Sequence, residues 1–132
     1  MEGFFTISQQ KLNANSQPAT NGECKDWLGR PNKCGYGSFR FKDPRGHPDA
    51  LHKTVHVHRM ALMVEIADLD VPASMQASHL CNRKLCINTK HISFESAAVN
   101  NARKSCFQVG FCDGHMSETG VRLPDCLVHL SE

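Results

Sequence analysis

Aromatic residues and long apolar runs are scarce in this chain of 132 residues. It has one Trp and one Tyr, and no run approaches the roughly 18 apolar residues of a membrane span. We therefore expect no membrane partner. The first residues, MEGFFTISQQKLN, have no basic start, no apolar stretch of signal-peptide length and no small-residue cleavage site. We accordingly expect an intracellular protein.

Patterned apolar residues are also missing from residues 1–20, which are rich in Gln, Asn, Ser and Thr. This composition predicts a flexible lead-in, followed by a single domain over residues 21–132. A domain of that size with few aromatics gains stability from cross-links or bound metals.

Cysteine and histidine, in contrast, are abundant, with seven and eight residues. A fully paired disulfide framework would leave one of seven thiols over. Together with the absence of a leader, this favours zinc bound by Cys and His in a reducing compartment. The alternative is a disulfide-rich secreted interaction domain, which predicts no bound zinc.

Turn residues and apolar periodicity predict a hairpin followed by a helix. Residues 36–41 alternate as a strand, and the turn signal at 43–46 predicts a return strand at 53–57. An amphipathic helix is expected from about residue 56 to the Asp-rich stretch before Pro72. Its core-facing positions have helical spacing: Met60, Met63, Val64 and Ala67.

A second unit of two strands and a helix is expected downstream. Residues 75–80 and 92–94 are short strand candidates, separated by the loop CNRKLCINTKH. Ser96 can cap a helix that runs to about residue 104. Beyond Cys106 the sequence is loop-like, so a cross-link is needed to keep that segment ordered.

The loop between those strands has the ligand spacing of a zinc site. Cys81, Cys86 and His91 provide three borderline-soft ligands within eleven residues. The fourth ligand must come from elsewhere, and both Cys24 and Cys34 are available.

A second set of ligands lies downstream. Cys106, Cys112, His115 and Cys126 provide four ligands, with His129 as an alternative. Three cysteines and a histidine at each of two structural zinc sites leave one cysteine spare.

Basic residues are concentrated in two segments although the formal net charge is only +2. Residues 30–59 contain seven Lys/Arg against two Asp, and residues 79–106 contain five against one Glu. Such local basic segments can follow a phosphate backbone, or they can be ordinary solvated surface.

The downstream unit resembles a known family. The similarity rests on Ala77-Ser78-His79-Leu80-Cys81, Cys86, His91, Glu95-Ser96, Asn100, Arg103 and Cys106. In these residues the chain is similar to the His-Cys box homing endonucleases, which belong to the ββα-metal (His-Me finger) nucleases. The resemblance implies an α+β fold: a small zinc-stabilised ββα-metal domain with an upstream β-hairpin and helix and a loop-rich C-terminus. It also favours Cys24 over Cys34 as the fourth ligand of the first zinc.

The same resemblance implies an activity. His79 would be the general base of a DNA endonuclease, and Asn100 would hold a single catalytic Mg²⁺. Arg45, or else Arg40, would lie near the scissile phosphate. Double-stranded DNA is the implied partner, the nucleus the implied location, and a homodimer is left open. The alternative function is a catalytically inactive zinc module that binds nucleic acid or a protein partner.

Overall fold

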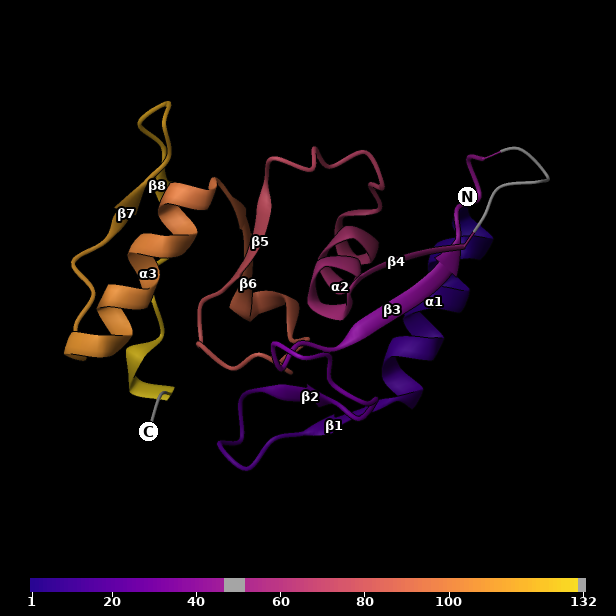
Figure 1. The fold of residues 1–132 in the computed structure, drawn as a ribbon, viewed down its shortest axis with the longest axis horizontal. Helices are drawn as coiled ribbons and strands as arrows, with labels where there is room; N and C mark the ends of the chain where they lie inside the picture. The colour runs from indigo at the N-terminus through magenta and orange to yellow at the C-terminus, as the bar shows by residue number, and fades with distance from the viewer. Residues whose placement is uncertain (47–51, 131–132) are drawn as a thin grey trace.

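Residues 1–46 and 52–130 are described by a computed structural model, and the element labels below refer to them. These residues form three α-helices, two 3-10 helices and four two-stranded antiparallel sheets. In Figure 1, α3 and the β7–β8 hairpin lie at one end of the molecule and α1 lies at the other, with α2 and the β5–β6 hairpin between them. This small mixed domain confirms the predicted α+β class.

The N-terminal segment differs from its prediction. The sequence predicted a flexible lead-in over residues 1–20, but the structure has α1 (Glu2–Ala14) and β1 (Ser16–Pro18) there. Leu12 is buried, and Phe4 and Phe5 pack against the same core. Phe4 and Phe5 share a helix face with Leu12 at spacings of eight and seven residues, but the polar residues between them mask the pattern. β1 then pairs with β2 (Lys25–Trp27), with Ser16 opposite Trp27.

The predicted hairpin and helix are both present. β3 (Ser38–Lys42) pairs with β4 (His52–His56), and α2 (Val57–Ile66) follows directly. Gly37 permits this close arrangement, because a Cβ at that position would lie 2.6 Å from the Trp27 ring and 2.7 Å from the Val57 side chain. The helix ends at Ala67, whose backbone is left-handed and whose N–H donates to the carbonyls of Met63 and Val64.

The downstream unit also has the predicted order of elements. β5 (Gln76–His79) pairs with β6 (Ile92–Glu95) after the short η1 helix (Thr89–His91). α3 (Ala97–Val109) begins at Ser96, whose hydroxyl accepts a hydrogen bond from the Val99 N–H at 3.3 Å. The helix continues past residue 104 to left-handed Gly110, the first residue that favours a C-cap.

The C-terminal segment is rich in loops, as expected, with little regular structure. It contains the two-residue strands β7 (His115–Met116) and β8 (Arg122–Leu123) and the η2 turn (Val128–Leu130). The Leu127 N–H donates to the Leu80 carbonyl at 2.7 Å, which brings this segment back to the end of β5.

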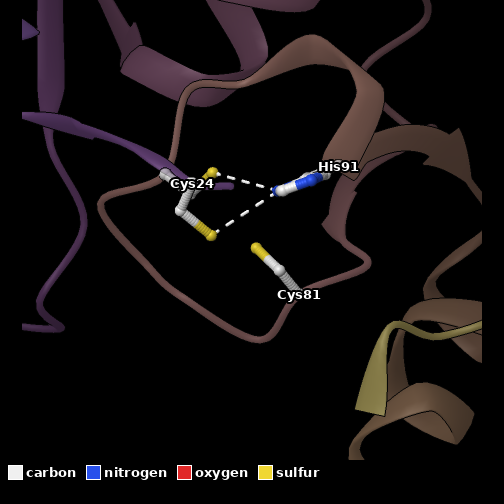
Figure 2. A group of neighbouring side chains, drawn as sticks. Cys24, Cys81 and His91 are labelled. Atoms are coloured by element: carbon white, nitrogen blue, oxygen red, sulfur yellow. Dashed lines mark hydrogen bonds between the residues drawn. The ribbon is translucent and has the colours of Figure 1, made fainter. Parts of the chain in front are cut away.

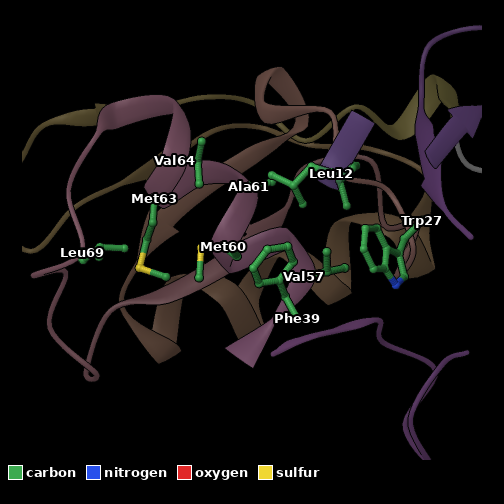
Figure 3. Close-up of a cluster of buried hydrophobic side chains, with 10 residues drawn as sticks. Leu12, Trp27, Phe39, Val57, Met60, Ala61, Met63, Val64 and Leu69 are labelled. Carbon is green, nitrogen blue, oxygen red and sulfur yellow. The ribbon is translucent and has the colours of Figure 1, made fainter. Parts of the chain in front are cut away.

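The hydrophobic core lies around α2 (Figure 3). Its buried members come from α1, β2, β3, α2 and the loops that follow: Leu12, Trp27, Phe39, Val57, Met60, Ala61, Met63, Val64, Leu69 and Ile87. Three of the predicted core-facing residues, Met60, Met63 and Val64, are among them, whereas Ala67 is exposed because the helix ends there. Within the described residues, no helix has the length and apolar character to cross a bilayer.

Candidate metal centres and active site

The first group of ligands gathers where β2, the end of β5 and the η1 helix meet. Cys24, Cys81, Cys86 and His91 are all buried, and their ligand atoms lie within 4.8 Å of one another. Figure 2 shows Cys24, Cys81 and His91 with these atoms turned toward one another.

The spacing of these atoms fits zinc. His91 Nδ1 lies 3.5 Å from Cys24 Sγ and 3.6 Å from Cys86 Sγ. Zinc bonds of about 2.3 Å to sulfur and about 2.0–2.1 Å to nitrogen give tetrahedral S···N edges of about 3.5 Å. Hydrogen bonds to Cys86 Sγ, first of all from the Cys81 thiol, lower the Cys86 pKa, whereas the pKa of Cys81 is raised. The cluster thus already favours one thiolate, the form that binds zinc.

Backbone pairing between β2 and the zinc loop selects Cys24 as the fourth ligand. Trp27 N–H donates to the Leu85 carbonyl at 2.8 Å, and Ile87 N–H donates to the Lys25 carbonyl at 2.7 Å. Cys24 precedes this pairing directly. Cys34 is exposed and belongs to neither ligand group, so it is the spare cysteine.

The second group of ligands fastens the C-terminal segment to α3. Cys106, Cys112, His115 and Cys126 have their ligand atoms within 4.8 Å of one another. His115 Nε2 lies 3.4 Å from Cys106 Sγ and 3.5 Å from Cys126 Sγ, the same zinc-like edges. The alternative ligand, His129, is exposed, and its Nε2 lies 3.8 Å from a Glu23 carboxylate oxygen instead. The two Cys₃His groups therefore support two zinc ions.

A buried ion pair connects the second ligand group to the β5–β6 hairpin. The Arg103 guanidinium on α3 donates to both carboxylate oxygens of Glu95, with Nε 2.7 Å from Oε1, and Nη1 donates to Cys126 Sγ at 3.3 Å. Burial is the largest influence and opposes ionisation of Glu95, but the hydrogen bonds to its carboxylate and the positive charge of Arg103 together outweigh it and hold the Glu95 pKa below its ordinary value.

His79 and Asn100 line one hollow between β5 and α3. The hollow has a volume of 290 Å³, and Lys84 and Lys104 also line it. Asn100 additionally lines a neighbouring hollow of 290 Å³ with His56, His58 and Gln76. The structure thus brings together two of the three residues that the resemblance implied for catalysis.

The environment of His79 determines which of its ring nitrogens carries a proton. His79 Nε2 lies 2.8 Å from the Cys86 carbonyl oxygen, which can only accept, so Nε2 carries the proton and Nδ1 keeps a lone pair. Burial lowers the His79 pKa, which favours the neutral ring.

The family comparison agrees with this geometry. The family model described as the zinc-binding loop region of homing endonuclease matches residues 25–132. The chain belongs to this family. No curated protein and no solved structure matches it. Membership in the homing endonuclease family accounts for the zinc loop and the adjoining β-β-α unit as parts of a His-Me nuclease-related zinc module.

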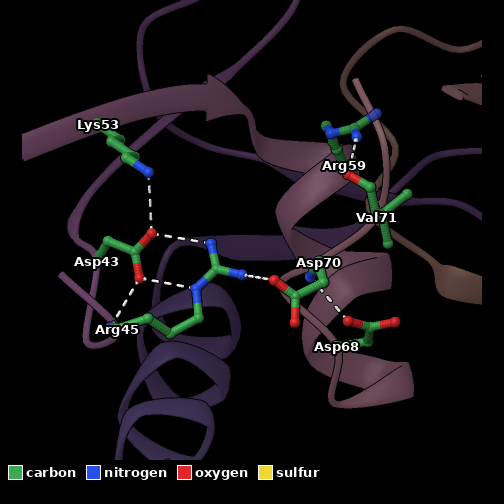
Figure 4. Close-up of polar contacts among 7 residues, drawn as sticks. All are labelled: Asp43, Arg45, Lys53, Arg59, Asp68, Asp70 and Val71. Atoms are coloured by element: carbon green, nitrogen blue, oxygen red, sulfur yellow. Dashed lines mark hydrogen bonds and ion pairs between the residues drawn. The ribbon is translucent and has the colours of Figure 1, made fainter. Parts of the chain in front are cut away.

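Arg45, the third implied catalytic residue of this homing endonuclease module, lies elsewhere. Its guanidinium donates to Asp43, with Nε 3.0 Å from Oδ1, and to Asp70 (Figure 4). Asp43 also accepts from Lys53 at 2.9 Å, and these contacts hold the Asp43 pKa well below its ordinary value. Among the described residues, neither Arg45 nor Arg40 lines the two hollows around Asn100. Arg45 pairs with Asp43 and Asp70 instead of facing a substrate phosphate, and the sequence motif gave no sign of these two carboxylate partners.

Several residues of the two hollows had no predicted role. Tyr36 lines both hollows. Its ring stacks on His56 at 4.8 Å, and the His58 ring lies 4.1 Å from that of His79. His58 Nε2 lies 2.9 Å from the Ala77 carbonyl oxygen, and burial lowers the His58 pKa to about 3. The only sequence signal for this ring cluster was the His-x-His pair, His56 and His58, at the start of α2.

Proposed function

We propose that this protein is a Mg²⁺-dependent endonuclease that hydrolyses phosphodiester bonds in double-stranded DNA. The observation that carries the proposal is the shared hollow of His79 and Asn100, which come from different elements, β5 and α3. Family membership supports a nuclease-related role, and the hollow supports the chemistry below.

His79 is suited to act as the general base. With Nε2–H bonded to the Cys86 carbonyl, Nδ1 is the nitrogen that can accept a proton from water. The water oxygen forms a bond to phosphorus, and the bond from phosphorus to the 3′ oxygen breaks. The water proton moves to Nδ1, and the leaving 3′ oxygen takes a proton from solvent.

Asn100 is suited to hold the divalent cation. Its amide oxygen is a hard donor of the kind that Mg²⁺ prefers, and Mg²⁺ sites commonly use few protein ligands beside phosphate and water. A bound Mg²⁺ would supply a Lewis acid that stabilises charge on the phosphate and the leaving oxygen.

The surroundings of the hollow favour a polyanionic substrate. Lys84 and Lys104 line it, and no carboxylate of the described residues lines either hollow around Asn100. Cations in a concave site attract phosphate groups and raise their local concentration.

The β3–β4 ribbon supports double-stranded DNA as the substrate. Ser38 pairs with His56, Arg40 with Thr54 and Lys42 with His52, and all six residues are exposed. Residues directly opposite each other in antiparallel strands share a face, so this face is polar and basic. A two-stranded ribbon fits the major groove, where such side chains can contact base edges and phosphates.

Cleavage of a supercoiled plasmid in Mg²⁺ tests the function. We expect His79→Ala and Asn100→Ala each to reduce the cleavage rate by about 10²-fold or more, the usual contribution of a general base or metal ligand. His129→Ala and Asn101→Ala are matched controls, because both residues are exposed and line neither hollow.

Equal nicking by all five proteins would overturn this assignment of the chemistry. DNA binding by the wild-type protein without any cleavage would instead favour the inactive zinc module.

We also infer that the protein acts inside the cell, in the nucleus. Six of its cysteines are required as zinc ligands, and reducing compartments keep thiols in that form. Imaging of the tagged protein tests this location. Whether the protein forms a homodimer is left open, and ultracentrifugation of the zinc-loaded protein with and without DNA tests it.

A further inference from the structure

Asn100 lines two neighbouring hollows, and its side-chain amide forms a hydrogen bond with a residue of the second. Asn100 lines both the hollow of His79 and the hollow of Gln76. Its Nδ2 donates to Gln76 Oε1 at 2.7 Å. Gln76 lines the second hollow and not the first. The contact therefore draws the NH₂ group toward the second hollow and leaves the amide oxygen for the hollow of His79.

The orientation of this amide determines whether Asn100 can bind a cation. The two ends of an asparagine amide have nearly the same shape, but only the oxygen accepts, whereas the NH₂ end donates. An amide turned over by half a rotation would present hydrogens to a cation. A partner that accepts from Nδ2 consequently stabilises the orientation that binds the metal.

Strand pairing places the exposed Gln76 where it can make this contact. Gln76 and Glu95 lie directly opposite each other in the β5–β6 hairpin. Glu95 binds Arg103, which lies one turn of α3 beyond Asn100. The buried Glu95–Arg103 pair thus sets the distance between hairpin and helix, and the Gln76–Asn100 hydrogen bond forms beside it.

We propose that Gln76 is a positioning residue that orients the Asn100 amide oxygen toward the cation and the substrate phosphate. This inference rests on the proposed function and adds to it the residue that sets the affinity of Asn100 for the metal. Gln76 is not required to touch the cation or the substrate.

Two substitutions at Gln76 separate its role as an acceptor from its bulk. Gln76→Met has a similar length but removes the amide acceptor, whereas Gln76→Glu can still accept from the Asn100 NH₂ group. Gln108→Met is the matched control, because Gln108 is an exposed residue of α3 that lines neither hollow. Zinc content and circular dichroism of each variant establish that it is folded.

The first measurement is binding of Mn²⁺ to the zinc-loaded protein, followed by the electron paramagnetic resonance signal of free Mn²⁺. The second is the Mg²⁺ concentration that gives half-maximal plasmid cleavage. We expect Gln76→Met to lower the Mn²⁺ affinity, and to raise the Mg²⁺ concentration needed for half-maximal cleavage, by about 10- to 100-fold each. This is the usual effect of losing a partner that orients a metal ligand. Gln76→Glu and Gln108→Met should remain within about threefold of the wild-type protein in both measurements.

An unchanged Mn²⁺ affinity in Gln76→Met would overturn the inference while the proposed function stands. Mn²⁺ binding by Gln76→Glu more than tenfold tighter than wild type would also overturn it, because Gln76 would then be a direct ligand. A wild-type protein that neither binds Mn²⁺ nor cleaves DNA would instead overturn the proposed function itself, and the inference with it.

Discussion

At the scale of single residues, Arg103 has the most demanding position in the molecule. Its side chain is 2% exposed and that of its partner Glu95 is fully buried. Two charges so far from water are stable only when each is paired and hydrogen-bonded. Arg103 satisfies Glu95 and also reaches the Cys126 ligand. One side chain thus connects the hairpin, α3 and the second zinc group.

We predict that Arg103→Met destabilises the zinc-loaded protein by about 3–5 kcal/mol, because the Glu95 carboxylate is left buried without a partner. Without Arg103, the pKa of Glu95 in the folded protein rises above its value in the unfolded chain, so folding takes up a proton. The loss of stability relative to the wild type therefore becomes smaller as pH falls. Urea unfolding at pH 8 and pH 6 measures both effects. The double variant with Glu95→Gln should recover part of the loss, and a double variant no more stable than Arg103→Met would contradict this account.

At the scale of elements, α1 is the helix that the sequence analysis did not predict. Its apolar face is narrow, but Leu12 is only 1% exposed and lies in the core cluster, and the helix packs against α2. Propensity and composition describe a segment by itself, whereas most helical stability in a protein comes from packing. The other two helices could be predicted from the sequence, because α2 has a wide buried face and α3 begins at a clear N-cap, Ser96.

We predict that Leu12→Ala lowers the free energy of unfolding by about 2–5 kcal/mol, the usual effect of emptying a buried leucine site. Ile7→Ala is the control on the same helix, because Ile7 is 66% exposed and its truncation should change stability by at most about 0.5 kcal/mol. Urea unfolding monitored by the Trp27 fluorescence compares the two. Equal effects of the two substitutions would mean that α1 does not contribute to the core.

At the scale of the whole molecule, the two ligand groups stabilise different parts of the fold. The first joins the segment before β2 to the loop between β5 and β6, and the second joins α3 to the segment that follows it. The first lies beside the core residues Trp27 and Ile87, and the second holds a segment with little regular structure. A small domain that buries little apolar surface gains much of its stability from such sites.

We predict that Cys81→Ser and Cys112→Ser each lower the zinc content from two ions to one, whereas Cys34→Ser keeps both. Loss of the first site should cost several kcal/mol or more and abolish cooperative unfolding, because that site lies against the core. Loss of the second should mainly expose the amides that follow Cys106. Metal analysis, thermal melting and hydrogen exchange measure these effects. A Cys81→Ser protein that melts like the wild type would refute the first zinc site.

Local order along the chain was readable from the sequence alone. Cys81, Cys86 and His91 are close in the chain, and the strands and the capped helix around them follow from short-range periodicity. The motif around His79 was sufficient to identify the family, because its residues belong to one compact β-β-α unit. These features depend on spacing over a few residues, which a sequence displays directly.

Pairings between distant segments depend on the tertiary structure. Ligand spacing left both Cys24 and Cys34 available and the family resemblance favoured Cys24; the pairing of β2 with the zinc loop is what brings Cys24 into the first ligand group. Arg45 binds Asp43 and Asp70 because the fold brings those carboxylates beside it. Gln76 meets Asn100 because a buried ion pair sets the distance between hairpin and helix. The sequence determined which residues were available, and strand pairing and competition among charged neighbours determined which of them meet.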